Sequence, residues 1–537
     1  MKIKNCSQLV ALVLALFFSA PLLAQTKTQA ANKKFNTLIN MLDRVYVDSV
    51  NVEELAELAI VKMLEELDPH TIYFSAEELK KANEPLDGSF EGVGIQFNIM
   101  KDTIIVVSPI AGGPSEKLGI KSGDRIVQVD DEITAGVGIQ NSDVARLLKG
   151  PKGTSVTVHI VREGVDEILE FDVIRDKIPI YSIVASHMID DEIGYIKVSR
   201  FAKTTMEELR DALEDLNSRG MQDLILDLQG NGGGMLSTAI NMSDEFLSGR
   251  KLIVYTEGRA FPREDTHASY DGLFEKGRLI VLVDEGSASA SEIVSGAIQD
   301  WDRGLIVGRR SFGKGLVQRP IQLGDGSAVR MTVQKYYTPA GRCIQKPYDE
   351  GVEAYRSEKY ERWDNGEMQS LNSLDLPDSL MYKTNIKGRK VYGGGGILPD
   401  FFVPVDTSSN SESFMNLLRK GLLSEYALLF VDSNRESLEA EYPTEDDFVK
   451  SHAFTDKEIE DLKTWCKDEG VDITKEDWET SGEAILIRYR AFVGRNLFES
   501  KTFYRVIGDL NESLLEAIDI LHDGRFEKSK LAFKTFR

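Results

Sequence analysis

The sequence predicts a multidomain α/β protein that contains an additional, mostly β module. The chain has 537 residues, several times the usual domain length, so it should divide into several domains with separate cores. Residues 86–176 are rich in glycine turns and β-branched runs, which is typical of a compact β module. From residue 177 onward, apolar strands alternate with helical patterns, and this alternation indicates a layered α/β core.

The same patterns divide the chain into segments. We expect a signal peptide over 1–24, a helical region over 25–85, the β module over 86–176, the α/β core over 177–405 with a polar insertion near 346–390, and an acidic helical region without an assigned role over 406–537. Apolar residues at helical spacing between 34 and 67 predict two helices, and Pro69 should stop the second one. In the core, we expect strands at 194–198, 223–228, 279–283 and 304–307, and helices at 206–217, 235–247 and 289–301.

The composition argues against some partners. Lys and Arg together number 64 against 87 Asp and Glu, and the net charge is −23. A chain this acidic repels nucleic acid and anionic membrane surfaces. Hydrophobic residues at 42% and charged residues at 28% are ordinary for a folded soluble protein. We therefore expect no nucleic-acid partner and little disorder.

The N-terminus has the layout of a secretory signal. Lys2 and Lys4 precede an apolar run over 9–23 and a small residue, Ala24, after which we expect cleavage. The third residue before this cut is Leu22, which is larger than the small residue usual at that position. An uncleaved membrane anchor is therefore the alternative. The run is shorter than the roughly 20 residues of a spanning helix, and no later segment is long and apolar enough. The mature chain should be exported to the periplasm and should have no stable membrane span.

Cysteine usage is sparse. Once Cys6 leaves with the signal peptide, only Cys343 and Cys466 remain. Two cysteines provide no disulfide framework and no zinc spacing, so we expect structural or free thiols, one bridge at most, and no metal site.

Ser289 is the first candidate catalytic residue. It follows a buried strand and a glycine-containing turn and precedes a helix, a location at the carboxyl end of a strand where open α/β folds hold their sites. The amide of Ala290 at the helix N-terminus is able to donate to a developing oxyanion. The alternative is structural, because Ser289 and Glu292 have the spacing of a capping box.

Lys314 is the candidate base, because no histidine lies in a recognisable triad motif. It stands 25 residues after Ser289, between Gly313 and Gly315 in a tight connection. If 314–318 is extended, Lys314 and Gln318 share one face, so the Gln318 amide would orient the amine. Desolvation lowers the pKa of a lysine amine toward neutral pH. A solvated loop lysine is the alternative.

The segment from Leu224 to Met235 runs from an apolar strand through a glycine-rich turn into a helix. Such a turn exposes amides to an anion. It lacks the GxGxxG order and the Gly-Lys-Ser/Thr ending of a phosphate loop, so an oxyanion-hole turn fits better. A turn whose glycines serve only backbone geometry is the alternative.

Five segments together resemble the carboxyl-terminal processing peptidases, also called tail-specific proteases: LDPHTIYF (67–74), DLQGNGGG (227–234), GSASASEIVSGAIQD (286–300), FGKGLVQ (312–318) and YYTPAGRCIQ (336–345). The resemblance covers about residues 35–405. It implies a ClpP/crotonase-like layered core without a cofactor. It also implies Ser289 as the nucleophile, Lys314 as the general base, Gln318 as the residue that positions Lys314, and the amides of Gly233 and Ala290 as the oxyanion hole. Two positions depart from the family pattern. The family commonly has Arg where this chain has Gln229, and often Pro where this chain has Gly232.

The β module resembles a PDZ domain of this family, on the residues Gly92, Val93, Gly94, Ile95 and Phe97 and on the segment 108–130. Its loop would offer amides to a terminal carboxylate, and the following strand would accept an added peptide strand. A folded spacer is the alternative. The partners we expect are proteins or peptides with free C-terminal tails. The sequence leaves open whether the chain forms a homo-oligomer.

These observations predict an exported serine endopeptidase that captures proteins by their C-terminal tails and cleaves them through an acyl-enzyme. The competing hypothesis is a non-catalytic PDZ scaffold on a degenerate protease fold. The joint presence of Ser289, Lys314 and Gln318 favours the enzyme.

Overall fold

The computed structural model describes residues 27–374, 377–529 and 531, and the predicted signal peptide lies outside the described residues. Its described residues form two units: those of 27–75 with 320–331, and those of 76–319 with 332–531. In the first unit, residues 27–45 are helical, α2 spans Val52–Glu65, and β1 (Ile72–Phe74) pairs antiparallel with Ala328–Arg330. α2 ends at Glu65, ahead of the expected stop at Pro69.

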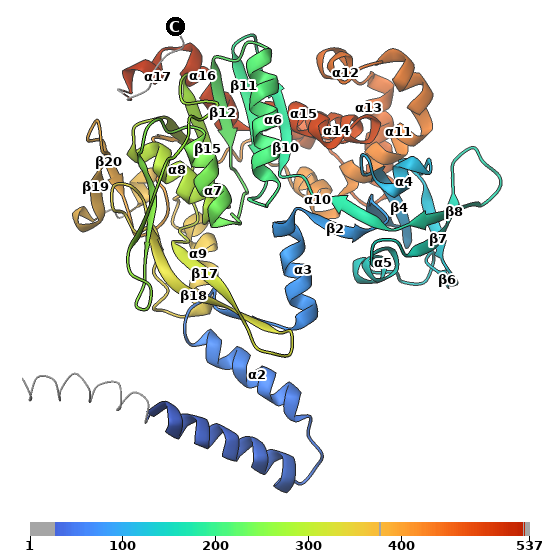
Figure 1. Ribbon diagram of the computed structural model, residues 1–537. Helices are drawn as coiled ribbons and strands as arrows, with labels where there is room; N and C mark the ends of the chain where they lie inside the picture. Colours follow the sequence, from blue (N-terminus) through green and yellow to red (C-terminus); the bar gives the residue numbers. More distant parts are fainter. Residues whose placement is uncertain (1–26, 375–376, 530, 532–537) are drawn as a thin grey trace, which may run out of the picture. The chain divides into compact units, whose positions relative to one another are not determined.

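The sheet that carries the candidate site has the order β10-β11-β12-β15-β16-β21, and Figure 1 labels its strands β10, β11, β12 and β15. Five of its strands run parallel, namely β11 (Ile193–Val198), β12 (Asp223–Asp227), β15 (Leu279–Val283), β16 (Leu305–Gly308) and β21 (Phe401–Phe402), and only β10 (Ile183–Met188) is antiparallel. Three helices connect or follow these strands: α6 (Thr205–Ser218), α7 (Leu236–Asp244) and α8 (Ala290–Asp300). The predicted alternation of strands and helices is confirmed.

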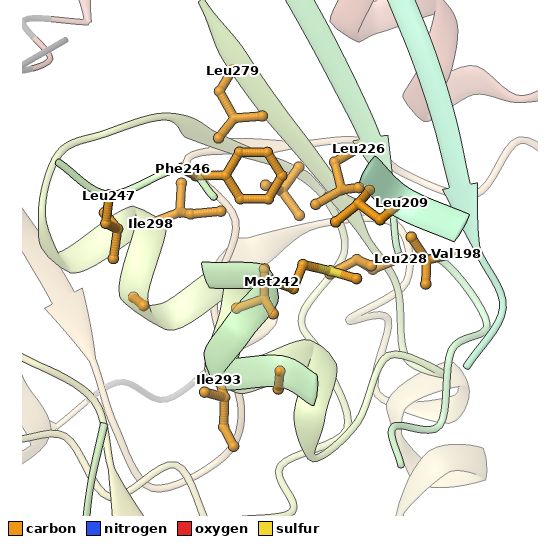
Figure 2. Packing of buried hydrophobic residues seen from close by; sticks show 14 of the residues in the cluster. Val198, Leu209, Leu226, Leu228, Met242, Phe246, Leu247, Leu279, Ile293 and Ile298 are labelled. Atoms are coloured by element: carbon orange, nitrogen blue, oxygen red, sulfur yellow. The ribbon is translucent and has the colours of Figure 1, made fainter. Parts of the chain in front are cut away.

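Both faces of this sheet are buried, which explains its continuous apolar strands. Leu224, Leu226 and Leu228 face a core shared with α6, α7 and α8, and Figure 2 shows Met242, Phe246, Ile293 and Ile298 in this core. Ile225 points to the opposite face, where Leu514, Ala517 and Ile520 of α16 (Glu512–His522) cover the sheet. The C-terminal region therefore supplies one layer of the α/β core.

A second sheet lies in the same α/β part of the chain. β13 (Leu252–Glu257) pairs with β14 (Glu264–His267) and, through residues 255–257, with the end of β18 (Ala328–Tyr337). The polar segment that we expected to be an insertion contains α9 (Val352–Asp364), the 3₁₀ turns η1 (Leu371–Ser373) and η2 (Asp378–Leu380), and the hairpin of β19 (Met381–Lys383) and β20 (Lys390–Tyr392).

The β module contains a sheet of order β3-β4-β5-β7-β8, with β6 beside β5. Its strands are β3 (Ile95–Met100), β4 (Thr103–Pro109), β5 (Arg125–Val129), β6 (Glu132–Ile133), β7 (Ser155–Val161) and β8 (Leu169–Ile174), and its helices are α4 (Pro114–Lys117) and α5 (Asn141–Leu148). The pair β2 (Ser89–Gly92) and β9 (Asp176–Pro179) stands where the chain enters and leaves it, after α3 (Ala76–Asp87). The predicted mostly β module is confirmed.

The C-terminal region is helical, as predicted. It contains α10 (Glu412–Lys420), α11 (Leu422–Glu441), α12 (Glu445–Ser451), α13 (Asp456–Asp468), α14 (Lys475–Leu497), α15 (Ser500–Ile507), the 3₁₀ turn η3 (Gly508–Leu510), α16 and α17 (Arg525–Lys528). Helices α12 to α14 each start with a threonine whose hydroxyl accepts from the amide three residues later, where an acidic residue completes a capping box. α10 to α15 enclose a core of their own.

Cys343 and Cys466 are both free thiols. Within the described ranges, no helix has the length and apolar character needed to cross a bilayer.

Candidate active site

Ser289 lies in the turn between β15 and α8, with backbone angles of φ 56° and ψ −109°. A side chain in this left-handed region costs about 1–3 kcal/mol and persists only where the surroundings enforce it. Every residue of α8 is buried, and Ala288 is buried as well, whereas Ser289 is partly exposed. The fold thus holds one reachable hydroxyl in a strained turn at the carboxyl end of the sheet.

Lys314 lies on the connection from β16 to β17 (Leu316–Gln322). Its Nζ donates a 3.0 Å hydrogen bond to Oε1 of Gln318. The flanking glycines are required by close backbone approaches: a Cβ on Gly313 would lie 3.1 Å from the carbonyl carbon of Gly395, and one on Gly315 would lie 2.9 Å from the Gln345 amide. The close-packed glycines thus fix the backbone of Lys314, and Gln318 orients its amine.

Glu292 ties the serine turn to the lysine loop. Its Oε2 accepts from the amides of Ser289 (2.8 Å) and Lys314 (2.9 Å), and its Oε1 accepts from the Gly313 amide (2.7 Å) and the Ser311 hydroxyl (2.5 Å). Burial raises the pKa of Glu292, while these four donors oppose that shift. The predicted capping residue therefore has a second role, because one carboxylate sets the spacing of both candidate catalytic residues.

Tyr336 fixes the same two residues through their carbonyl oxygens. Its hydroxyl lies 3.0 Å from the Ser289 oxygen and within hydrogen-bond distance of the Lys314 oxygen. Tyr336 is fully buried, and burial raises its pKa well above the ordinary value, so the hydroxyl remains a neutral donor. In both Ser289 and Lys314, the backbone amide therefore binds Glu292 and the backbone carbonyl binds Tyr336.

We expect Tyr336→Phe to reduce the free energy of unfolding by about 1–2 kcal/mol and to lower kcat, because two partly buried carbonyl oxygens lose the one hydroxyl hydrogen that they share. Denaturant unfolding and peptide hydrolysis measure the two effects. Tyr337→Phe is the matched control, because Tyr337 contributes a ring that stacks on Tyr255 at 4.7 Å and the variant retains that ring. Equal loss in both variants would contradict the role of the Tyr336 hydroxyl.

The segment that we expected to be a polar insertion supports the lysine loop. Arg362 on α9 is 2% exposed and donates to the carbonyl oxygens of Arg310, Ser311 and Phe312. Glu358 accepts hydrogen bonds from the side chains of Arg310, Lys346 and Arg362. Although burial opposes ionisation, Arg362 and Lys346 lower the pKa of Glu358 to about 2. Apart from its abundance of charge, this segment has no sequence pattern that indicates the contact.

The glycine-rich turn packs directly against Ser289. A Cβ on Gly233, whose φ is 100°, would lie 2.8 Å from the Ser289 Cβ and 3.0 Å from the Ala290 amide nitrogen, so only glycine fits. The Gly233 amide donates to Oδ1 of Asn231 at 2.9 Å, and the Asn231 carbonyl accepts from the Ala288 amide. The Ala290 amide is in the first turn of α8, where amides lack an intrahelical partner. An oxyanion role for Gly233 requires its amide to be shared with Asn231 or released from it.

The five residues of the predicted peptide-binding loop lie at the start of the β module. Gly92 ends β2, Gly94 has φ 78°, and Ile95 opens β3, which is an edge strand of its sheet. Val93 and Ile95 are buried in the module core, and Phe97 packs against that core. An edge strand has unpaired backbone groups available to another chain.

The structure shows several positioning residues that we did not predict: Asn231, Tyr336, Glu358 and Arg362. The spacing of Glu292 indicated only a helix cap. Tyr336 lies in one of the five recognised motifs, and that was its only signal.

Comparison with known proteins gives three matches to family descriptions. Residues 192–354 match "Peptidase family S41", residues 105–162 match "PDZ domain", and residues 413–499 match a family of unknown function, DUF8443. A carboxy-terminal-processing protease of Bartonella bacilliformis is 36% identical over 372 residues, which cover 66% of this chain and 84% of that protein. The carboxy-terminal processing protease CtpA of Bacillus subtilis is 35% identical over 63% of this chain and 72% of its own length.

Proposed function

Because this chain belongs to the carboxy-terminal processing proteases of peptidase family S41, we propose that it cleaves proteins captured by their C-terminal tails, with Ser289 as the nucleophile and Lys314 as the general base. The observation that carries the proposal is the shared support of these two residues: Glu292 Oε2 accepts from both of their amides. Two residues whose backbone amides bind one carboxylate oxygen have a fixed backbone separation, which favours the fixed placement that a nucleophile and its base require.

The reaction follows from these positions. The Lys314 amine takes the proton of the Ser289 hydroxyl as Oγ bonds to the scissile carbonyl carbon. The amides of Gly233 and Ala290 receive the oxyanion of the tetrahedral intermediate. As the C–N bond breaks, Lys314 returns the proton to the leaving amine, and an acyl-enzyme remains on Ser289. Water, deprotonated by Lys314, then attacks the ester carbonyl carbon. The C–O bond to Ser289 breaks, Lys314 returns the proton to Oγ, and the acid is released. Gln318 accepts from Lys314 Nζ at 3.0 Å and keeps the amine oriented.

Tail capture is assigned to the PDZ domain. The loop Gly92–Ile95 offers amides to a terminal carboxylate, and the edge strand β3 accepts the tail as an added strand. Long-range attraction does not contribute, because the net charge is −23 and screening limits repulsion to about 8–10 Å. Local amides and an apolar pocket near Phe97 must therefore provide the affinity, and apolar tails should be preferred over acidic ones.

We expect amidation of a substrate C-terminus to weaken binding by tenfold or more. The full chain carrying Ser289→Ala serves as a non-cleaving trap, and its Kd is measured for three peptides that differ only at the end: free apolar, free acidic and amidated apolar. The free apolar peptide should bind most tightly, and deletion of residues 88–176 should remove the difference. Equal affinity for all three peptides would contradict tail recognition and leave the Ser-Lys chemistry unaffected.

Export is also part of the proposal. Lys2, Lys4 and the apolar run over 9–23 support it, with the periplasm as the compartment and an uncleaved anchor as the alternative.

A further inference from the structure

A side-chain hydrogen bond joins the glycine-rich turn to the C-terminal region. Nδ2 of Asn511 donates a 2.8 Å hydrogen bond to Oε1 of Gln229. Gln229 is two residues from Asn231 and four from Gly233 in the turn that packs against Ser289. Residues 500–531 lie outside all three family matches, so the function of this contact is unassigned.

Asn511 is itself held firmly. It is the N-cap of α16, and its Oδ1 accepts from the Leu514 amide at 3.2 Å. Leu514, Ala517 and Ile520 of this helix pack in one core with the central strands of the sheet. The Asn511 side chain thus has a fixed position relative to the strands that deliver the turn.

The backbone of the turn is held by hydrogen bonds to the groups around it. The Gln229 amide donates to Asp227 at 2.7 Å, its carbonyl accepts from Lys197 at 3.2 Å, and the Gly230 amide donates to Asp284 at 2.8 Å. Gly230, Gly233 and Gly234 all have positive φ, and glycine residues restrict a backbone least. The shape of the turn therefore depends on these contacts, and Asn511 adds one from the C-terminal region.

A cavity of about 420 Å³ lies behind the turn, and its walls include Gln229, Gly230, Asp284, Arg488, Tyr504 and Asn511. Close packing between the turn and the C-terminal helices is incomplete at this place, so their relative position depends on directed contacts such as the Asn511–Gln229 hydrogen bond.

We propose that Asn511 is a positioning residue that holds the glycine-rich turn through Gln229. The C-terminal region then contributes to the geometry of the peptidase site. This inference rests on the proposed function, because it assumes that the turn delivers an amide to the oxyanion. It also gives a reason for the departure at Gln229: the glutamine of this chain pairs with the asparagine of its own C-terminal region.

The experiment uses isosteric substitutions in the full chain. Gln229→Glu leaves the Asn511 donor with an acceptor, and Asn511→Asp keeps the helix cap and allows the Gln229 amide to rotate and donate. Each single variant should lower kcat less than about threefold. The double variant has two carboxylates and no donor, and its kcat should fall at least tenfold beyond the product of the single effects, with KM for a peptide changed less than twofold. Gln229→Arg combined with Asn511→Asp restores a donor and should recover most of kcat.

A control double variant, Gln222→Glu with Asn416→Asp, makes the same change in charge at positions remote from the turn and should retain wild-type kcat. The melting temperature of every variant is measured alongside, because a purely structural contact would lower it without a selective effect on kcat. Additive effects in the Gln229/Asn511 pair, or no recovery with Gln229→Arg, would overturn the inference. Failure of the proposed function is distinct, since Ser289→Ala would then cleave normally in the wild-type background.

Discussion

Ser289→Ala and Lys314→Ala are each expected to lower the rate of peptide-bond cleavage by at least about 10⁴-fold, because a nucleophile and its base act as a unit. For the same reason, the double variant should lose little more than either single variant. Lys314→Arg should be equally inactive, since a guanidinium remains protonated and accepts no proton. The measurement is kcat on an unstructured peptide that has a free apolar C-terminus.

The fold should survive these substitutions, because Glu292 and Tyr336, which hold the backbones of Ser289 and Lys314, stay in place. A serine-reactive phosphonate should label the wild type, fail to label Ser289→Ala, and label Lys314→Ala only slowly. The wild-type rate should fall on acidification, because only the unprotonated amine takes the serine proton. Normal cleavage by Lys314→Ala with an unchanged pH profile would refute the assignment of the base.

The parts of this protein that follow a periodic pattern could be predicted from the sequence. The strand at 279–283 was predicted without error, and α6 and α8 differ from the prediction by one residue at each end. Buried parallel strands give continuous apolar runs and amphipathic helices give a 3.6-residue period, so each can be detected locally. The pairing of Lys314 with Gln318 also has a local cause, since both residues lie within five positions of one another.

The supporting contacts could not be predicted, because they join residues distant in the sequence. Tyr336 lies 47 residues from Ser289 along the chain, and Arg362 lies 50 residues from Phe312. A buried polar side chain has no periodic signature, and its partner is known only when the chain is folded. The capping-box interpretation of Glu292 was correct about its contact with the Ser289 amide, and it missed the three donors that come from the lysine loop.

Glu292→Gln is expected to reduce the free energy of unfolding by about 2–4 kcal/mol and kcat by about 10²-fold or more. The four partners of the carboxylate are all donors, and an amide replaces one acceptor oxygen with a further donor. In either orientation of the glutamine, two donors lose their acceptor, and a buried donor without an acceptor costs about 1–3 kcal/mol. If the amide nitrogen faces Ser289 and Lys314, both lose the contact that sets their spacing.

Denaturant unfolding and kcat measured well below the melting temperature separate these two effects. Glu207→Gln is the matched control, because it makes the same substitution on an exposed position of α6 and should change neither quantity. The phosphonate provides a third measurement: Glu292→Gln retains the Ser289 hydroxyl and the Lys314 amine, so slow labelling would show that both groups are present but poorly placed. Wild-type labelling and stability in Glu292→Gln would instead show that the serine turn and the lysine loop keep their positions without this carboxylate.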